Sequence, residues 1–281
     1  MNNIERVDFY LGNIINLDKS DITLKSNINL LQDNPYYDHN LKNLLIKTNN
    51  DKKKFNFVRH DNWVYQQPTC FLKSRGRDFP NDGVILRCLN FKRHWENYYN
   101  KPKDMKFDKK LNKVIWRGTT TGQPSNPASR FKLVTEYYNK YTNIDVGFSF
   151  ICQGKENFKK YVKGKLNINQ MLKYKYIISV EGNDKDSGLN WKLNSNSVIL
   201  MAKPRITTWL METTLLPGVH YVLLKDDYSD LREKYIWCKN NQAKCEQIIK
   251  KANQFMEQFS NQKREEEIEK AVINKYFDIT N

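Results

Sequence analysis

The sequence has no long hydrophobic run and little that would support a disulfide framework or a zinc site. No uninterrupted apolar stretch approaches the roughly 20 residues that a membrane-spanning helix needs. Residues 1–21 contain no apolar core of the kind found in signal peptides. The five cysteines form no CxxC pair, so we expect buried or unused thiols rather than disulfides or zinc ligands. The cytosol is therefore the expected compartment.

Several common catalytic signatures are also missing. The four histidines have no metal-like spacing, and the chain contains no Gly-x-Ser-x-Gly, P-loop or Cys-His signature and no internal repeat. These absences argue against the hydrolase and phosphate-loop enzyme classes that those motifs mark, and against repeat architectures.

The charge is strongly basic, with 47 Lys and Arg against 31 Asp and Glu, a formal net charge of +16. The basic residues are dispersed, and the densest runs, "DKKKFNF" and "NKPKDMKFDKK", are short and interrupted. A solvated basic surface is the simplest interpretation, and attraction to an anionic partner such as a nucleotide, a phosphorylated glycan or a lipid headgroup is the next. No zinc-finger spacing or aromatic RNA-binding strand is present, so nucleic acid is not an expected partner.

From Lys113 onward, short apolar runs alternate with helical patterns, which predicts a βαβ series and an α/β fold. Runs that are apolar throughout, such as "YIISV" and "SVILM", are typical of a parallel sheet covered on both faces. The expected strands are 113–116, 144–148, 176–182, 197–202 and 220–225. One helix is expected to begin with Asn126 as its N-cap and Pro127 in its first position, and another to begin at Ser229 or Asp230. Further helices are expected over 167–175, 189–195 and 207–213, and two more in the tail 241–277.

Polar residues follow two of these strands, and in parallel sheets a ligand lies beyond the carboxyl ends of the strands. Such loops suit a diphosphate, because glycine lets the backbone approach an anion while hydroxyls, guanidinium groups and ammonium groups donate hydrogen bonds. The candidate residues are Arg117, Gly118, Thr119, Arg130, Gly188 and Lys192, and Glu181 at the end of its strand could accept hydrogen bonds from hydroxyls. An ordinary strand-to-helix turn would account for the first loop equally well.

Two further carboxylate positions have alternative interpretations. Asp184 and Asp186 form a DxD pattern that could chelate a divalent metal, but a solvated loop is the favoured interpretation because DxD is common by chance. Glu212 could accept hydrogen bonds from the vicinal hydroxyls of a ribose, or could be an exposed helix carboxylate.

The segment 97–112 is charged with little apolar periodicity and could connect two domains.

Taken together, these segments resemble glycosyltransferase family 90, most closely its lipopolysaccharide-type members. The resemblance covers roughly Cys70 to Phe277 and is carried by "FLKSRGRD", "GVILRCLNFKRHW", "VIWRGTTTGQ" with the following "SR", "LKYKYIISVEGNDKDSGLNWKLNSNSVILM" and "WLMETTLLPGVHYVLLKDDYSDL". It implies a GT-B architecture, with two Rossmann-like domains facing across a cleft and helices at the C-terminus. The expected domains are an acceptor-side domain over 1–112, a nucleotide-sugar domain over 113–260, and a helix over 261–281 that packs back on the first domain.

The resemblance also implies a reaction: transfer of a sugar, glucose or xylose, from a UDP-sugar, with inversion and without an essential metal or other cofactor. It places Gly118 and Thr119 against the diphosphate, with Arg130 and Lys192 as its cationic partners. Ser187 and Gly188 would shape the same loop, and Glu212 would hold the ribose.

The catalytic base is less clearly indicated. Protein O-glucosyltransferases of this family carry an Asp base where this chain has Arg93 or His94. An inverting transfer needs a group that takes the proton of the acceptor hydroxyl, which neutral histidine can do and arginine cannot. His94 is the first candidate, and Asp82 and Asp61 are the others.

The expected function is therefore an inverting glycosyltransferase that acts on a glycan, a lipid carrier or a lipopolysaccharide-type acceptor. Peripheral contact with an anionic membrane would fit the basic charge. The alternative is a non-catalytic basic protein that binds an anionic glycan or nucleic acid on a transferase scaffold, which the missing Asp base keeps open.

Overall fold

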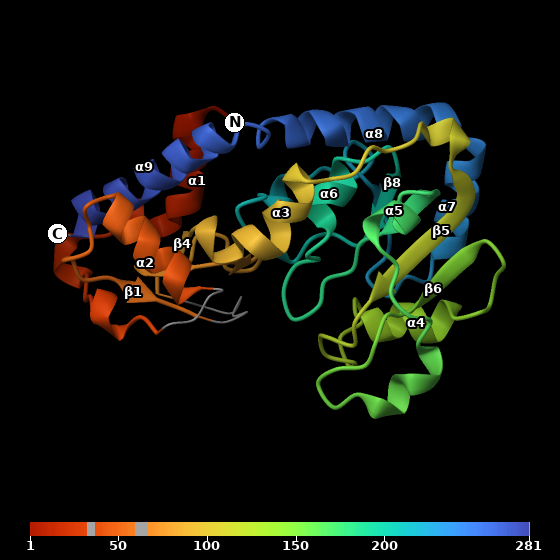
Figure 1. Cartoon of the computed structure of the whole chain (residues 1–281), viewed down its shortest axis with the longest axis horizontal. Helices are drawn as coiled ribbons and strands as arrows, with labels where there is room; N and C mark the ends of the chain where they lie inside the picture. Colours follow the sequence, from red (N-terminus) through yellow and green to blue (C-terminus); the bar gives the residue numbers. More distant parts are fainter. Residues whose placement is uncertain (33–36, 60–66, 281) are drawn as a thin grey trace. The chain divides into compact units, whose positions relative to one another are not determined.

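A computed structural model describes residues 1–32, 37–59 and 67–280 of the chain. The chain packs into two compact units (Figure 1). Unit 1 consists of Met1–Trp95, Arg205–Thr213 and Phe259–Asn281, and unit 2 of Glu96–Pro204 and Thr214–Gln258.

Unit 2 contains a five-stranded parallel sheet of order β10-β8-β7-β5-β6. Its strands are β5 (Leu111–Gly118), β6 (Ile144–Phe148), β7 (Tyr174–Ile178), β8 (Val198–Met201) and β10 (Val222–Leu223). Every residue of β8 is buried, and Ile177 and Ile178, which point to opposite faces of β7, are both fully buried. The expectation of an α/β fold with a parallel sheet covered on both faces is confirmed.

The helices of unit 2 supply the cover for this sheet. They are α3 (Glu96–Tyr99), α4 (Arg130–Tyr137), α5 (Ile168–Met171), α6 (Leu189–Leu193), α7 (Leu231–Asn240) and α8 (Gln242–Glu257), with short helices η6 (Phe107–Lys109) and η7 (Glu156–Tyr161). Leu133 of α4, Leu231 of α7 and Ile248 of α8 share one hydrophobic cluster with Val146 and Leu200 of the sheet. The predicted helix starting at Ser229 or Asp230 is confirmed, since Asp230 is the N-cap of α7.

Two predicted helix positions are wrong. The helix after β5 begins at Arg130 with Ser129 as its N-cap, because the Asn126 side chain accepts a hydrogen bond from Ala128 N at 3.0 Å and closes a separate turn. The segment 207–213 is not an α-helix. Its start belongs to strand β9, and Met211 then has a positive φ of 59°, a backbone conformation that interrupts a helix.

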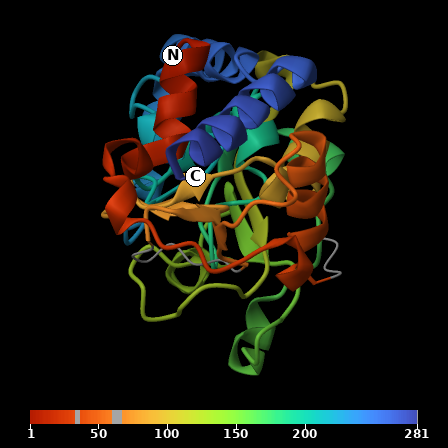
Figure 2. The same cartoon turned by 90° about the vertical axis from the view of Figure 1, so that its left-hand side faces the viewer.

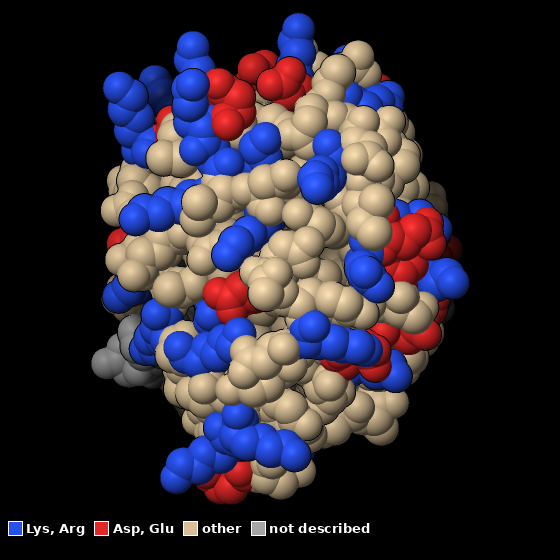
Figure 3. Space-filling model, turned by 90° about the vertical axis from the view of Figure 1, so that its right-hand side faces the viewer, with Lys and Arg blue, Asp and Glu red and all other residues tan. Residues whose placement is uncertain are grey.

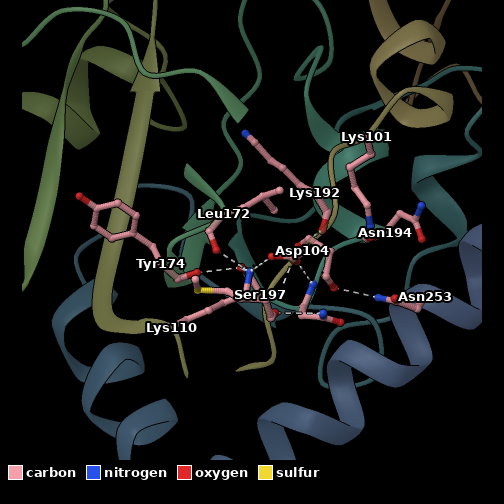
Figure 4. Close-up of polar contacts among 12 residues, drawn as sticks. Lys101, Asp104, Lys110, Leu172, Tyr174, Lys192, Asn194, Ser197 and Asn253 are labelled. Atoms are coloured by element: carbon pink, nitrogen blue, oxygen red, sulfur yellow. Dashed lines mark hydrogen bonds and ion pairs between the residues drawn. The ribbon is translucent and has the colours of Figure 1, made fainter. Parts of the chain in front are cut away.

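The charged segment that could connect two domains is held within unit 2 by a buried network (Figure 4). Lys110 Nζ donates to Asp104 Oδ1 at 2.6 Å, to the Leu172 carbonyl at 2.6 Å and to Ser197 Oγ at 2.9 Å. The other oxygen of Asp104 accepts from the Asn196 N–H at 2.6 Å. Burial lowers the pKa of Lys110, and the Asp104 carboxylate opposes that shift. The network fixes the chain that leads into β5 against the strands beside it.

Unit 1 contains a small parallel sheet of order β1-β2-β4 and an antiparallel pair, β3-β9. The strands are β1 (Asn56–Phe57), β2 (Cys70–Leu72), β3 (Arg75–Gly76), β4 (Val84–Ile85) and β9 (Ile206–Thr207). The helices are α1 (Asn3–Leu11), α2 (Asp38–Lys47) and α9 (Gln262–Thr280), with short helices η1 (Gly12–Asn16), η2 (Lys19–Asp21), η3 (Ile28–Leu30), η4 (Cys88–Asn90), η5 (Phe91–Trp95) and η8, which spans Glu212–Thr214. The two long helices expected in the tail are confirmed as α8 and α9.

Helices α1 and α9 lie side by side in unit 1 (Figure 2), joined by a buried ion pair. Arg6 donates to both carboxylate oxygens of Glu265, at 2.6 and 2.7 Å. The Trp209 indole N–H donates to the same carboxylate at 2.7 Å, and the Tyr10 ring stacks on Trp209 with ring centroids 3.8 Å apart. Three separate stretches of the chain therefore build one core.

Two further findings concern the whole described chain. All five cysteines are free thiols, as the sequence predicts. Among the described residues, no helix is both long enough and apolar enough to span a bilayer.

Candidate functional site

Two loops meet at the carboxyl edge of the sheet in unit 2. One follows β5 and spans residues 119–129, and the other follows β7 and spans 179–188. Since β5 and β7 pair in parallel, with Ile115 beside Ile177, both loops leave the sheet at the same edge. This is the edge at which open α/β sheets bind their ligands.

Arg130, the first residue of α4, bridges the two loops. On the side of β5, its guanidinium donates to the Thr119 carbonyl at 3.2 Å, to Thr119 Oγ1 at 3.3 Å and to Thr121 Oγ1 at 2.7 Å. On the side of β7, it donates to the carbonyls of Glu181 at 3.2 Å and Val180 at 3.3 Å. Since Arg130 is only partly buried, a positive charge is held at the point where the loops meet.

Glycines allow this close meeting of the loops. A Cβ on Gly182 would lie 2.5 Å from Thr121 Oγ1 and 2.9 Å from an Arg130 guanidinium nitrogen. Gly122 has a φ of 93°, and its N–H donates to Asn183 Oδ1 at 2.8 Å. A larger residue at Gly182 would push the arginine and the loop after β5 away.

Gly118 and Thr119 have different surroundings. A Cβ on Gly118 would lie 2.5 Å from the Trp116 ring, so this glycine makes room for the indole. Thr119 is partly buried, and its hydroxyl lies 3.5 Å from that of Thr121. Gly118 ends β5 and Thr119 begins the loop after it, which Arg130 contacts, and their contact with a diphosphate stays a prediction.

Asp186 organises the second half of the loop after β7. It accepts hydrogen bonds from Ser179 Oγ at 2.7 Å, from the Gly188 N–H at 2.9 Å and from Lys192 Nζ. Burial alone would raise the pKa of Asp186, but the Lys192 ammonium and these hydrogen bonds hold it below its usual value. Ser187 and Gly188, both partly buried, form the turn between Asp186 and α6.

The interpretation of "DKD" as a solvated loop is wrong. Asp184, Lys185 and Asp186 are only 5%, 4% and 8% exposed. Lys185 and Asp186 turn inward because α6 offers them partners: Lys185 Nζ donates to Asn190 Oδ1 at 2.6 Å, and Asp186 pairs with Lys192. In the part of the chain that the structure describes, no group of three or more His, Cys, Asp or Glu side chains is placed to hold a metal ion.

The ammonium of Lys192 is itself buried. It donates to the Ile178 carbonyl at 3.2 Å as well as to Asp186, and the residue is 4% exposed. Lys192 therefore ties α6 to the end of β7. In the structure its positive charge is paired with the Asp186 carboxylate, and its contact with a phosphate stays a prediction.

Arg117 is also paired. Its guanidinium donates to both carboxylate oxygens of Asp145 at 2.9 Å, and Lys163 Nζ reaches the same carboxylate at 2.8 Å. Burial raises the pKa of Asp145, but the hydrogen bonds and charges of Lys163 and Arg117 outweigh that effect and lower it. The sequence identified Arg117 as a donor-binding candidate without signalling this partner on β6.

The remaining candidates belong to unit 1. Glu212 is buried and accepts hydrogen bonds from the Thr208 N–H at 2.7 Å and from Thr208 Oγ1 at 2.9 and 3.1 Å, so it is not an exposed helix carboxylate. His94 lies in η5 and is 2% exposed. Asp82 is partly buried and close enough to Arg75 to act on its pKa. Asp61 lies outside the described residues.

The structure thus brings Thr119, Arg130 and the Glu181 backbone together, and separately gathers Ser187, Gly188 and Lys192 around Asp186. Sequence reasoning missed Asn183 and Ser179, which hold the loop after β7 in shape. A signal for Asp186 was present, since "DSG" is typical of a turn in which an aspartate accepts from the N–H two residues on.

Comparisons with known proteins show the family to which the chain belongs. The sequence model described as "Glycosyl transferase family 90" matches residues 89–278. The chain is 35% identical to the "O-glucosyltransferase LpsA" of Dichelobacter nodosus over 209 residues, which is 74% of this chain and 62% of that protein. It is 28% identical to "Protein O-glucosyltransferase 2" of Danio rerio over 152 residues, 53% of this chain and 29% of that protein.

A viral protein is similar as well. "Uncharacterized protein 179R" of Invertebrate iridescent virus 6 is 35% identical over 100 residues, 34% of this chain and 8% of that protein. The chain therefore spans less than two thirds of the length of each of these relatives.

Proposed function

Because the chain belongs to glycosyltransferase family 90, we propose that it transfers a sugar from a UDP-sugar donor to a glycan or lipid-linked acceptor. The observation that carries this proposal is Arg130 at the meeting point of the two loops. Hydrogen bonds to carbonyls and hydroxyls orient the guanidinium there, and a guanidinium suits an anionic diphosphate.

The proposed sugar is glucose, with xylose as the alternative. Two of the relatives carry the word O-glucosyltransferase in their names, which supports glucose. A lipopolysaccharide-type acceptor is proposed on the resemblance of the sequence segments to the lipopolysaccharide-type members of the family. A GT-B architecture is proposed on the same family membership.

The proposed chemistry is a single displacement with inversion. The acceptor oxygen attacks the anomeric carbon, the bond from that carbon to the diphosphate breaks, and UDP departs with the electron pair. Arg130 would stabilise the charge that develops on the departing UDP, without an essential metal. Gly118 and Thr119 would lie against the diphosphate, Lys192 would be its second cationic partner, and Glu212 would bind the ribose.

A proton must leave the acceptor hydroxyl during this step. His94 is our first choice of base, because a neutral imidazole accepts a proton near pH 7, and Asp82 and Asp61 are the alternatives. The base would take the proton directly from the acceptor oxygen as the new glycosidic bond forms.

Two measurements test the proposal. The first is a thermal-shift screen of the full chain with nucleotide sugars, in which a ligand that binds only the folded chain raises the melting temperature. The second is transfer or hydrolysis of the radiolabelled sugar from whichever donor binds. Binding of UDP-glucose followed by release of UDP supports the proposal. Binding without turnover, with any acceptor tried, would favour the non-catalytic binding protein instead.

A further inference from the structure

A strongly basic segment of unit 2 lies between β6 and α5, and none of the candidate donor-site residues belongs to it. Residues 150–165, "FICQGKENFKKYVKGK", contain five lysines, one glutamate and no arginine. We call these residues the basic segment. Figure 1 places it at the lower right, and Figure 3 shows Lys and Arg side chains gathered at the lower end of the view, with little acidic surface beside them.

Four of its lysines face solvent without compensation. Lys159, Lys160 and Lys165 are exposed and Lys155 is partly exposed, and in the described part of the chain none of the four has an ion-pair partner. The fifth, Lys163, pairs with Asp145 at 2.8 Å. The segment therefore presents a local cluster of like charge, which costs free energy unless an anionic partner accepts it.

The basic segment is held in place by an aromatic anchor. Phe158 of η7 packs against Phe131 of α4 and Phe148 of β6, with ring centroids 4.5 and 6.1 Å apart. Glycines with positive φ, Gly154 at 66° and Gly164 at 82°, turn the chain at either side of η7. This packing fixes the backbone that carries the lysines.

Aromatic surface accompanies the charge. Phe150 is 42% exposed, with Lys165 Nζ 4.8 Å from its ring centre. Lys160 Nζ lies 5.0 Å from the partly exposed Tyr161 ring. Lysine ammonium groups beside exposed aromatic rings are a combination that suits the boundary between lipid headgroups and acyl chains.

We propose that the basic segment docks unit 2 on an anionic lipid bilayer. The absence of arginine from the segment favours a bilayer over a nucleic acid or a single phosphate group as the partner. Nucleic acids and phosphate groups are bound best by the bidentate guanidinium fork, whereas lysines act as point charges toward a diffuse anionic surface. Docking would hold the chain at the surface where a lipid-linked acceptor lies. The inference stands on charge and exposure and does not require that the proposed glycosyl transfer be correct.

The test is sedimentation of the full chain with vesicles of phosphatidylcholine alone or of phosphatidylcholine mixed with phosphatidylglycerol. Wild type should bind only the anionic vesicles, and high salt should release it. The variant with Lys155, Lys159, Lys160 and Lys165 changed to Gln should lose roughly fivefold in partitioning per lysine, about 600-fold in total.

A matched control removes the same charge elsewhere in unit 2. Lys239, Lys244, Lys250 and Lys251 are exposed on α7 and α8, and changing all four to Gln alters the net charge equally. This control should keep most of the vesicle binding. Phe150→Ser should weaken binding to anionic vesicles without changing its salt dependence.

Three outcomes would overturn the inference. Equal loss in both quadruple variants would show that net charge alone drives adsorption, and equal binding to neutral vesicles would show that charge is not the cause. Binding to heparin that depends on the basic segment, without vesicle binding, would identify an anionic polymer as the partner. Circular dichroism of each variant checks that it is folded, and UDP binding should be unchanged in both quadruple variants.

Discussion

Changing Arg130 to alanine is the sharpest test of the donor site. Five hydrogen bonds join the side chain to described residues of the two loops; the one to Thr121 Oγ1 at 2.7 Å is short and the other four, at 3.2–3.3 Å, are long. Net values of roughly 0.5 kcal/mol for each long bond and roughly 1 kcal/mol for the short one predict a loss of about 3 kcal/mol of folding stability. The chain should remain folded at 25 °C if its stability lies within the usual range of about 5–15 kcal/mol.

The effect on UDP is separate from the effect on stability. A charge-assisted hydrogen bond to a phosphate contributes about 1.5–3 kcal/mol, so the affinity for UDP should fall by about 10- to 150-fold. Arg130→Lys keeps the charge but cannot bridge both loops, and we expect an intermediate loss. Isothermal titration calorimetry with UDP measures the affinity, and urea unfolding measures the stability.

The control for this test is Arg232→Ala. Arg232 is an exposed arginine of α7 whose guanidinium lies over Tyr141, so its removal changes the net charge equally but leaves both loops intact. UDP affinity should be unchanged in this variant. Equal affinity of wild type and folded Arg130→Ala would refute the assignment of Arg130 to the diphosphate.

Four other predictions follow from the site. Asp186→Asn should cost about 3–5 kcal/mol of unfolding free energy at pH 7. The pKa of Asp186 is lower in the folded chain than in the unfolded one. The stability that its carboxylate contributes is therefore fully present above the usual aspartate pKa of about 3.9 and is lost as the pH falls through the folded value. Urea unfolding measured against pH should show the stabilities of wild type and Asp186→Asn converging in acid. Gly182→Ala should weaken UDP binding because its Cβ displaces Arg130, whereas Gly218→Ala, with no atom within 4 Å of the new Cβ, should leave the affinity unchanged; equal affinities by calorimetry would contradict the role of the loop contact. Transfer activity should persist in excess EDTA, and a strict manganese requirement would oppose the metal-free mechanism. His94→Ala should reduce turnover at saturating donor by at least about tenfold with an altered pH profile; a smaller loss, with an inactive Asp82→Asn variant, would transfer the role of base to Asp82.

The parallel sheet could be predicted from the sequence because its signal is local. Strands that are buried on both faces need continuous apolar residues, and Tyr176–Ile178 and Val198–Met201 have them. The polar residues after each strand then had to meet at one edge, as the loops after β5 and β7 do. The start of helix α7 could be predicted for the same reason, because Asp230, a residue type favoured at N-caps, stands just before its first turn.

The partners of charged side chains could not be predicted in this way. The interpretation of "DKD" as solvated failed because Asp186 finds Ser179 and Lys192 only after β7 and α6 have packed. The helix expected over 207–213 failed for a similar reason. β9 forms there because β3, more than a hundred residues earlier in the sequence, provides its hydrogen-bonding edge. Pairing between distant segments decides such cases over local propensity.

The ion pair between Arg6 and Glu265 joins residues 259 positions apart, and this separation has a consequence for folding during synthesis. Domains usually fold in the order in which they leave the ribosome, the N-terminal one first. Here α1 emerges first, yet its partners Trp209 and Glu265 belong to later stretches, so its buried face must wait while Val7 and Leu11 remain uncovered. All of unit 2 has been synthesised once Gln258 has been added, before α9 exists. The part of the chain made first is therefore the part that finishes folding last.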